Sequence, residues 1–481
     1  MQQNVIEKNV YHSIRAIESL HQEIAYITCL PGFPIDNAIA TTVKDPDNST
    51  FTCKFFLKDL HGHTFNQKAD NFGINNEIIL KNSEGDYLIK AKSASKVTVL
   101  LGSPQVITVT IKNLQTAPDD DFNNQRLRLI VPIPFAKIDI DLFKCKPCKI
   151  EGTTTYAGLI EILIQDANFH LYTYEQPNTD KAFLFVDALE LHSLSHFKRL
   201  SRTILIAFGF ITGNLFQNEY YYQVVNDKEN LSLIDDTAFE QQEKSIITNS
   251  ALFDPMHFHD YLEHFGKLDL LKTITLDLQP QIFTNLCNAL FNNETLSRCL
   301  LLILEGSHSR FLLLRAAIYS IAIETITNII YEDNKDKMNP ITDQLLADKI
   351  QSKMLGVIEE YEAFLPETAK KILEAKVADI NKPTNAAKLS KPFELLGIKL
   401  SKDDIKILNH RNKFLHGTSP FKEDELESRQ VEISYIGRRL LFMVNCLVLK
   451  YVGYRGHVIN PAAWQQLNFE KEVTDHLYRV I

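Results

Sequence analysis

The sequence has no excess of basic residues: 51 Lys and Arg stand against 60 Asp and Glu, a formal net charge of −9. No global positive field therefore attracts polyanions, and any contact with a nucleic acid has to be local. Hydrophobic residues make up 45% of the chain, charged residues 23%, and neither Gly nor Pro is enriched, which excludes a disordered or collagen-like chain. The length of 481 residues predicts two or three domains.

Long apolar runs are also missing. The longest, which begin at Thr203 and Leu440, fall well short of a membrane span and predict buried helices. Residues 1–13 contain no apolar segment and no basic cluster, so no signal peptide is expected. The seven cysteines are odd in number and scattered, which suits a reducing compartment. We expect a cytoplasmic protein that does not bind a membrane.

Several motifs for cofactors are absent or incomplete. The sequence contains no Walker-type phosphate loop and no Gly-x-Gly-x-x-Gly after a strand. Cys145 and Cys148 have zinc-ribbon spacing, but no second Cys-x-x-Cys accompanies them. His257, His259 and His264 are not spaced i, i+4 as helical zinc ligands are. No cofactor is expected, although the sequence leaves open whether either group binds a metal.

The N-terminal half has the pattern of a β domain. Runs such as TFTCKFFL from Thr50 and RLRLIVPI from Arg126 are rich in Val, Ile, Thr and Phe and are separated by turn residues. They predict a mostly antiparallel sandwich or barrel over about 40–190, closed by an amphipathic helix at 193–217. A helix or two is expected within 1–30, where Val10, Ile14, Ile17 and Leu20 have helical spacing. Tyr220–Tyr222 could stack on bases, but packing between domains is expected.

The C-terminal half has helical periodicity. Helices are predicted at 256–266, 280–305, 308–332, 341–362, 367–379, 401–416 and 423–452. The expected fold class is α+β: a β-rich N-terminal domain (1–235), a helical connector (236–294) and an all-α helical bundle (295–481).

The most informative segment is SKDDIKILNHRNKFLHGTSP, which begins at Ser401. Ser401 and Asp404 have the spacing of a helix capping box. Arg411, Asn412 and His416 fall in the last turns of the predicted helix, with Asn412 and His416 on one face and Arg411 one position round. A helix C-terminus favours a protonated imidazole, and an arginine fork binds phosphate oxygens. This is a combination suited to a phosphodiester, although the spacing alone also fits a solvated arginine and a capping histidine.

The context resembles the HEPN superfamily, and within it the ApeA-like HEPN group of bacterial defence proteins. The family motif is Arg, a polar residue that is commonly Asn, three to five further positions, then His, and it corresponds here to Arg411–His416. The segment from Arg310 resembles the family's first long helix, with Glu324 as its internal acidic residue. The segment from Arg438 resembles the last long helix. The resemblance covers about 295–460.

This resemblance implies a metal-independent endoribonuclease that leaves a 2′,3′-cyclic phosphate and works as a homodimer or higher oligomer. Arg411, Asn412 and His416 would be catalytic, with Glu324 and Lys413 in support. Because the chain is acidic overall, we also expect RNA to bind in a narrow basic channel with Lys413, Arg438 and Arg439 at its edge. It also implies anti-phage defence by abortive infection, with a phage-derived or small-molecule trigger at the N-terminal domain. Thr418 stands where the HEPN toxins paired with nucleotidyltransferase antitoxins carry Tyr, so that mode of control is not expected. The alternative is a catalytically silent HEPN-fold module for interaction or oligomerisation.

Overall fold

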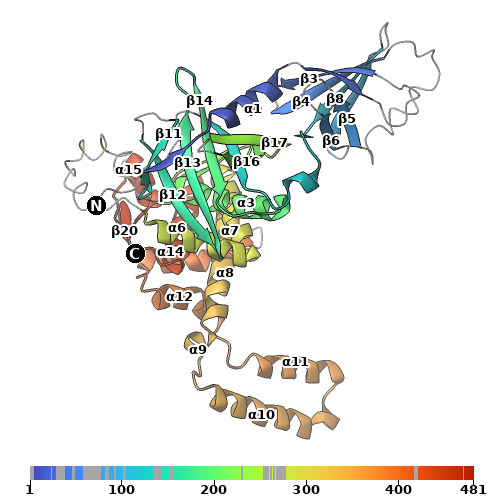
Figure 1. Ribbon diagram of the computed structural model, residues 1–481. Coiled ribbons are helices and arrows are strands. Elements are labelled where there is room, and N and C mark those ends of the chain that lie inside the picture. The colour runs from blue at the N-terminus through green and yellow to red at the C-terminus, as the bar shows by residue number, and fades with distance from the viewer. Residues whose placement is uncertain are drawn as a thin grey trace. The chain divides into compact units, whose positions relative to one another are not determined.

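A computed structural model shows a β-rich N-terminal unit and a helical C-terminal unit, so the fold class is α+β, as predicted (Figure 1). The first unit comprises Met1–Ile247 and Asp277–Phe291, and the second comprises Thr248–Leu276 and Asn292–Ile481. The residues that the structure describes are 5–22, 24–28, 38–45, 49–57, 77–81, 86–90, 94–100, 105–134, 142–151, 156–228, 231–252, 259, 263, 266, 278–415, 421–469 and 471–481.

One hydrogen-bonded sheet runs through the first unit and has 16 strands among the described residues. In spatial order they are β1 (Ile6–Lys8), β11 (Lys146–Ile150), β12 (Tyr156–Ile164), β13 (Ala167–Glu175), β14 (Lys181–Ala188), β10 (Leu127–Pro134), β16 (Glu219–Lys228), β17 (Leu231–Gln241), β9 (Asn113–Gln115), β6 (Asp86–Lys90), β5 (Glu77–Lys81), β2 (Ile24–Thr28), β3 (Ala38–Asp45), β4 (Thr50–Leu57), β8 (Gln105–Ile111) and β7 (Ala94–Leu100). Among the described strand pairs of this sheet, only β1–β11 is parallel. No described pairing joins β1 to β7. The described strands therefore do not close into a barrel, which was one of the two arrangements that the sequence allowed.

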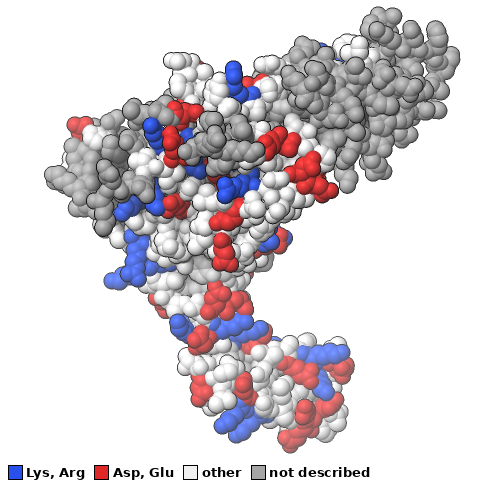
Figure 2. Space-filling model, in the orientation of Figure 1, with Lys and Arg blue, Asp and Glu red and all other residues white. Residues whose placement is uncertain are grey.

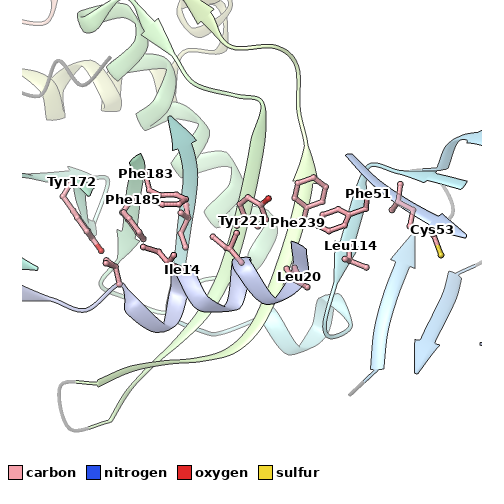
Figure 3. Close-up of a cluster of buried hydrophobic side chains, with 14 of the residues drawn as sticks. Ile14, Leu20, Phe51, Cys53, Leu114, Tyr172, Phe183, Phe185, Tyr221 and Phe239 are labelled. Atoms are coloured by element: carbon pink, nitrogen blue, oxygen red, sulfur yellow. The ribbon is translucent and has the colours of Figure 1, made fainter. Parts of the chain in front are cut away.

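Helix α1 (Tyr11–His21) packs against this sheet. Its buried residues Ile14, Ile17 and Leu20 have the helical spacing that the sequence predicted. Figure 3 shows Ile14 and Leu20 in one cluster with aromatic side chains of the strands, including Tyr221 and Phe239. The carboxylate of Glu151 accepts hydrogen bonds from the first backbone amides of the helix, those of Val10 and Tyr11. Hydrophobic burial and this side-chain cap fix the position of the helix.

The second helix of this unit, α3 (Leu194–Thr212), confirms the amphipathic helix predicted at 193–217. Ser193 caps its first turn, and Gly213 ends it in the left-handed conformation with φ of 80°. The following β16 carries Tyr220–Tyr222, and all three rings are buried inside the first unit. Base stacking by these tyrosines is therefore excluded. Their ring contacts, with His21, Phe197 and Phe239, lie within the first unit, whereas packing between domains was expected.

The second unit is largely helical. Its elements are α7 (Glu294–His308), α8 (Leu312–Asp333), α9 (Lys335–Met338), α10 (Gln344–Glu360), α11 (Glu367–Ala378), α12 (Asn385–Leu395), α13 (Lys402–Leu415), α14 (Gln430–Tyr451), α15 (Pro461–Asn468) and the paired strands β19 (His457–Ile459) and β20 (Tyr478–Val480). Helix α6 (Pro280–Asn292) precedes them and, up to Phe291, belongs to the first unit. The predicted helix at 280–305 is broken because the side chain of Asn293 caps α7 by accepting from the amide of Leu296 at 3.0 Å.

Helix α8 lies at the centre of the second unit and packs against α7, α12, α13 and α14. By length and composition it is the one helix of the described residues that could cross a membrane, and half of its most apolar window is buried. The apolar runs identified in the sequence did not include it. Because four neighbouring helices cover this helix, we assign it to the core of the second unit.

Helices α10 and α11 form a hairpin (Figure 1). Few of its side chains are buried. Only Ala347 and Ile358 of α10 and Val377 of α11 are classed as buried among the residues of these two helices. Large apolar side chains remain exposed, namely Leu345, Leu346, Met354, Val357, Tyr361, Phe364, Ile372 and Leu373. An apolar surface of this kind on an otherwise well-packed unit indicates an interaction surface.

Candidate active site

Helix α13 begins with the predicted capping box. The backbone amide of Ser401 donates to Asp404 Oδ2 at 2.8 Å, and the amide of Asp404 donates to Ser401 Oγ at 3.1 Å. Two amides that the helix leaves without partners are thereby satisfied. The prediction that this helix starts at Ser401 is confirmed.

The carboxylate of Asp404 also belongs to a buried ion network. Arg439 on α14 donates to it from Nε at 2.6 Å, and Arg479 on β20 donates from Nη2 at 3.1 Å. Asp475 completes the network 2.6 Å from Arg439 and 3.3 Å from Arg479. Burial alone would raise the pKa of Asp404, but the two arginines lower it below its ordinary value. The network fixes the start of α13 against α14.

Arg439 therefore does not have the role expected from the sequence. We expected it at the edge of an RNA channel, but its side chain is 1% exposed and is held by Asp404 and Asp475. A guanidinium enclosed by two carboxylates contributes to the structure and is not available to a phosphate. That prediction is wrong for Arg439.

Arg411 lies on the buried face of α13, seven residues after Asp404. The buried side chains of this helix are those of Asp404, Ile407, Leu408, Arg411 and Phe414, which lie on one side of a helix. The Arg411 side chain is only 6% exposed, and its Nη1 lies 3.4 Å from Oε2 of Glu324 on α8. The alternative of a solvated arginine at a helix end is therefore wrong for this residue.

The guanidinium of Arg411 is incompletely paired. Its buried Nε has no hydrogen-bond acceptor among the described residues. The Glu324 side chain is 48% exposed, and its contact is at the long end of hydrogen-bond distances. Burial lowers the pKa of Arg411, and Glu324 opposes this effect, so the group remains charged at neutral pH. A buried cation with an unused donor is a favourable place for an anion such as a phosphate.

Asn412 and Lys413 follow on the exposed side of α13. Asn412 lies about 100° round the helix from Arg411, as expected for adjacent helical residues. His416 lies among residues 416–420, outside the described residues, and so do Gly417 and Thr418. Of the predicted site residues, Arg411 and Glu324 are in contact in the structure. Asn412 and Lys413 are exposed and directly follow Arg411 on α13.

Sequence reasoning missed a second imidazole beside the motif. His410 directly precedes Arg411, and its buried Nδ1 has no partner among the described residues. Burial lowers the pKa of His410, as do Lys406 and Lys413, while Glu432 opposes them. The ring is therefore neutral at neutral pH and could accept a proton. Its place next to Arg411 was a signal in the sequence, but the family motif directed attention to His416.

The structure also bears on the metal candidates. No group of three or more His, Cys, Asp or Glu side chains could hold a metal among the residues that are described. Cys145 directly precedes strand β11, and Cys148 lies within that strand and is part of the hydrophobic core. His257 and His264 lie outside the described residues, and only His259 of that group is described.

No family model, curated protein or solved structure matches this chain. The functional argument therefore depends on the residues themselves. They define an α+β protein of two units, the second of which presents a buried, partly paired arginine at the C-terminal end of a capped helix. These features form the basis of the proposal that follows.

Proposed function

We propose that the protein is a metal-independent endoribonuclease of the HEPN type. The single observation that carries the proposal is the buried guanidinium of Arg411, paired with Glu324 at 3.4 Å and retaining an Nε that no described acceptor satisfies. A solvated arginine at a helix end does not destabilise the folded protein, whereas a buried and incompletely paired arginine does. Such a cost is typical of functional sites.

In this mechanism the substrate supplies the nucleophile. The ribose 2′-OH attacks the adjacent phosphorus, its proton passes to an imidazole, and the bond from phosphorus to the 5′-oxygen breaks. The leaving oxygen takes up a proton from an acidic group, and the products are a 2′,3′-cyclic phosphate and a 5′-hydroxyl. His416 moves the proton, and a second copy of the motif would supply the acid. The Arg411 fork holds the non-bridging oxygens as charge develops on them.

Glu324 is a positioning residue in this scheme. It lies on the central helix α8, and its carboxylate restrains the rotamers of Arg411 without enclosing the guanidinium. Because that carboxylate is half exposed, it compensates the buried charge only in part. A phosphate can then add to the arginine without first displacing a tight bidentate partner.

Asn412 and Lys413 are the exposed neighbours that can reach the substrate. Asn412 offers an amide for the sugar or phosphate, or orients the imidazole, and Lys413 adds a positive charge beside the backbone of the RNA. With a net charge of −9, the chain has no general affinity for polyanions. RNA binding is therefore local and weakens as the salt concentration rises.

A second copy of the chain is the partner we propose for the α10–α11 hairpin. An apolar stripe runs along one face of α10 at helical spacing. It consists of Leu346, Met354 and Val357 and continues at Tyr361, directly after the helix, and all four side chains are exposed. Acidic and basic side chains are mixed over the hairpin (Figure 2), so no field of one sign selects a nucleic acid or an anionic surface. An apolar stripe in a charge-balanced surface is complementary to itself, which a two-fold dimer requires. Dimerisation would supply the two copies of the Arg411–His416 motif that the mechanism uses.

The exposed stripe also supports the alternative, a HEPN-fold module that assembles but cuts nothing. The nuclease and the silent module are distinguished by whether the protein cleaves RNA. A silent module self-associates and leaves RNA intact with or without a chelator. By the same resemblance, we propose that the active form is a cytoplasmic toxin of anti-phage defence by abortive infection, regulated by the N-terminal unit.

The test compares the purified full-length protein with the variants Arg411→Ala and His416→Ala on RNA in the presence of EDTA. Loss of a positioned acid–base group is expected to slow cleavage about 100-fold or more. Arg298→Ala is the matched control because Arg298 is an exposed arginine of the same unit, on α7. His410→Ala tests the second imidazole. Full activity in both Arg411→Ala and His416→Ala would reject the proposal.

A further inference from the structure

Two arginines flank a close approach of helices α8 and α14 in the second unit. A Cβ at Gly437 on α14 would lie 3.8 Å from the backbone nitrogen of Ala316 on α8, so the two helices are in contact there. Arg315 directly precedes Ala316, and Arg438 directly follows Gly437. Both side chains are half-buried, and they begin beside the same contact, one on each helix.

Arg438 has a positive charge that no carboxylate balances. Its buried Nε lacks an acceptor, and the described part of the chain forms no ion pair with its guanidinium. Burial lowers the pKa of Arg438, and the charge of Arg315 lowers it further. An arginine stays protonated in spite of such a shift, so its donors remain charged and unused. Its neighbour Arg439, in contrast, is enclosed by Asp404 and Asp475.

Arg315 has one hydrogen-bond acceptor among the described residues, and that acceptor is neutral. Its Nε donates to the backbone carbonyl of Ser309, in the segment between α7 and α8. Glu305 lies one helical turn before Ser309, is exposed, and forms no ion pair with either arginine in the described structure. Two like charges therefore lie near each other without a counter-charge, which is destabilising unless an anion binds.

The surroundings of the two arginines are tightly packed. A Cβ at Gly306 on α7 would lie 3.2 Å from Cε1 of Tyr319, and the hydroxyls of Ser307 and Tyr319 share a hydrogen bond of 2.9 Å. Burial raises the pKa of Tyr319, while that hydrogen bond and the charges of Arg315 and Arg438 oppose the effect. Both arginines thus lie close to one buried phenol. A site on packed helices loses little conformational freedom when a ligand binds.

An exposed aromatic ring lies one helical turn from Arg315. The side chain of Phe311 is 75% exposed, and its carbonyl accepts from the amide of Arg315 at 3.0 Å, in the first turn of α8. Residues four apart on a helix are neighbours on its surface. His308 and Arg310, in the segment before this helix, are also exposed and add no negative charge. Unpaired cations beside an exposed aromatic ring are typical of surfaces that bind single-stranded nucleic acid.

We propose that Arg315 and Arg438 bind a phosphodiester of single-stranded RNA, with Phe311 stacked on a neighbouring base. The inference takes RNA as the ligand from the proposed function and adds a second contact to it. This contact is separate from the cleavage site, because Glu324, the partner of Arg411, follows Arg315 on α8 by nine residues, a rise of about 13.5 Å. The arginine pair would hold the strand at a phosphate other than the one that is cut.

The experiment is a fluorescence anisotropy titration of the full-length protein with a labelled single-stranded RNA. All 2′-hydroxyls of this RNA are methylated, so the proposed reaction cannot consume it. Arg315→Gln and Arg438→Gln are each expected to weaken binding about tenfold and to reduce the slope of log affinity against log salt by about 0.7. Phe311→Ala should weaken binding about fivefold or more without changing that slope. Arg298→Gln, at an exposed arginine of the same unit, is the control.

Urea unfolding of the same variants separates RNA binding from a structural role. Because Arg438 has no acceptor in the described structure, Arg438→Gln should leave the unfolding midpoint unchanged or raise it. A lowered midpoint together with an unchanged salt slope would make Arg438 a structural residue and overturn the proposal.

The binding results are decisive whether or not the protein cleaves RNA. Weaker binding and a smaller salt slope in both arginine variants, with neither change in the control, support the site. Wild-type affinity in both variants, an equal loss in the control, or no saturable binding by the wild type would overturn it. Displacement of the RNA by millimolar inorganic phosphate at constant ionic strength would assign the pair to a free anion and also overturn it. Arginine-dependent binding by a protein that cuts nothing would reject only the nuclease.

Discussion

The guanidinium of Arg411 on α13 lies 3.4 Å from the carboxylate of Glu324 on α8, a residue 87 positions earlier in the chain. The arginine is buried and the glutamate is half exposed, so the pair has one face toward the interior and one toward solvent. That asymmetry distinguishes it from the fully enclosed Asp404–Arg439 pair on the same helix. The N-terminal end of α13 is thus fixed by the Asp404–Arg439 pair, and its C-terminal part presents the positive charge of Arg411.

Glu324→Gln is expected to slow RNA cleavage about tenfold, mainly in kcat, because a neutral amide restrains the Arg411 fork less well. The unfolding free energy should change by less than about 1 kcal/mol, since the carboxylate is half exposed and screened. Steady-state cleavage rates and urea unfolding measure the two effects. Glu332→Gln, on the exposed side of the same helix, is the control. Equal rates for both variants would remove Glu324 from the site.

Asp404→Asn is expected to destabilise the second unit by about 3–5 kcal/mol, because it leaves buried Arg439 without its main counter-charge. Asp403→Asn, one residue away on the exposed side of α13, should change stability by less than about 0.5 kcal/mol. Urea unfolding followed by circular dichroism measures both. A loss of similar size in both variants would show that the network does not hold α13.

The stability of the first unit is expected to fall as the pH drops from 6.5 to 4. Burial and Lys44 lower the pKa of His21 to about 4, and burial and Lys8 lower that of His170 to about 4. In this window the unfolded chain binds protons at both histidines and the native protein does not, so protonation favours unfolding. Below this window, protonation of Asp187 removes a further contribution.

Thermal unfolding measured between pH 7 and pH 4.5 tests this dependence. His170→Gln should flatten the profile, whereas His196→Gln, at an exposed position of the same unit, should leave its slope unchanged. A wild-type melting temperature that stays constant over this range would contradict the assignment of these buried histidines as neutral groups.

Val357→Glu is expected to weaken self-association about tenfold or more, because it places a charge in the centre of the apolar stripe of α10. Ser352→Glu adds the same charge on the opposite side of this helix and should have no effect. Sedimentation at several protein concentrations measures the association. A monomer in the wild type, or an unchanged dimer in Val357→Glu, would reject the hairpin as the surface of self-association.

The sequence predicted much of the fold because its patterns are local. The strand runs at Thr50 and Arg126, the stripe of α1 and the capping box at Ser401 all lie where expected. The tertiary partners could not be predicted this way. Periodicity places Arg439 on a helix but does not show that Asp404 and Asp475 enclose it. Similarly, nothing local in β1 indicates that Lys8 pairs with Asp187 on β14.

The same distinction applies to the candidate site. The resemblance identifies Glu324 as the internal acidic residue of its helix, and in the structure this residue contacts Arg411. The family motif does not include His410, and its burial beside Arg411 is a tertiary property that the sequence pattern does not indicate. The periodicity also predicts the helices α10 and α11, but it does not indicate that their apolar side chains remain exposed.

The most direct test of the central claim uses one RNA in two forms, unmodified and with a 2′-deoxy sugar at the cleaved position, incubated with the full-length protein and EDTA. Attack by the substrate's own hydroxyl predicts cleavage of the unmodified RNA to a 2′,3′-cyclic phosphate and a 5′-hydroxyl, and no cleavage at the deoxy position. Cleavage of the deoxy substrate at an equal rate, or complete loss of activity with EDTA, would contradict the account.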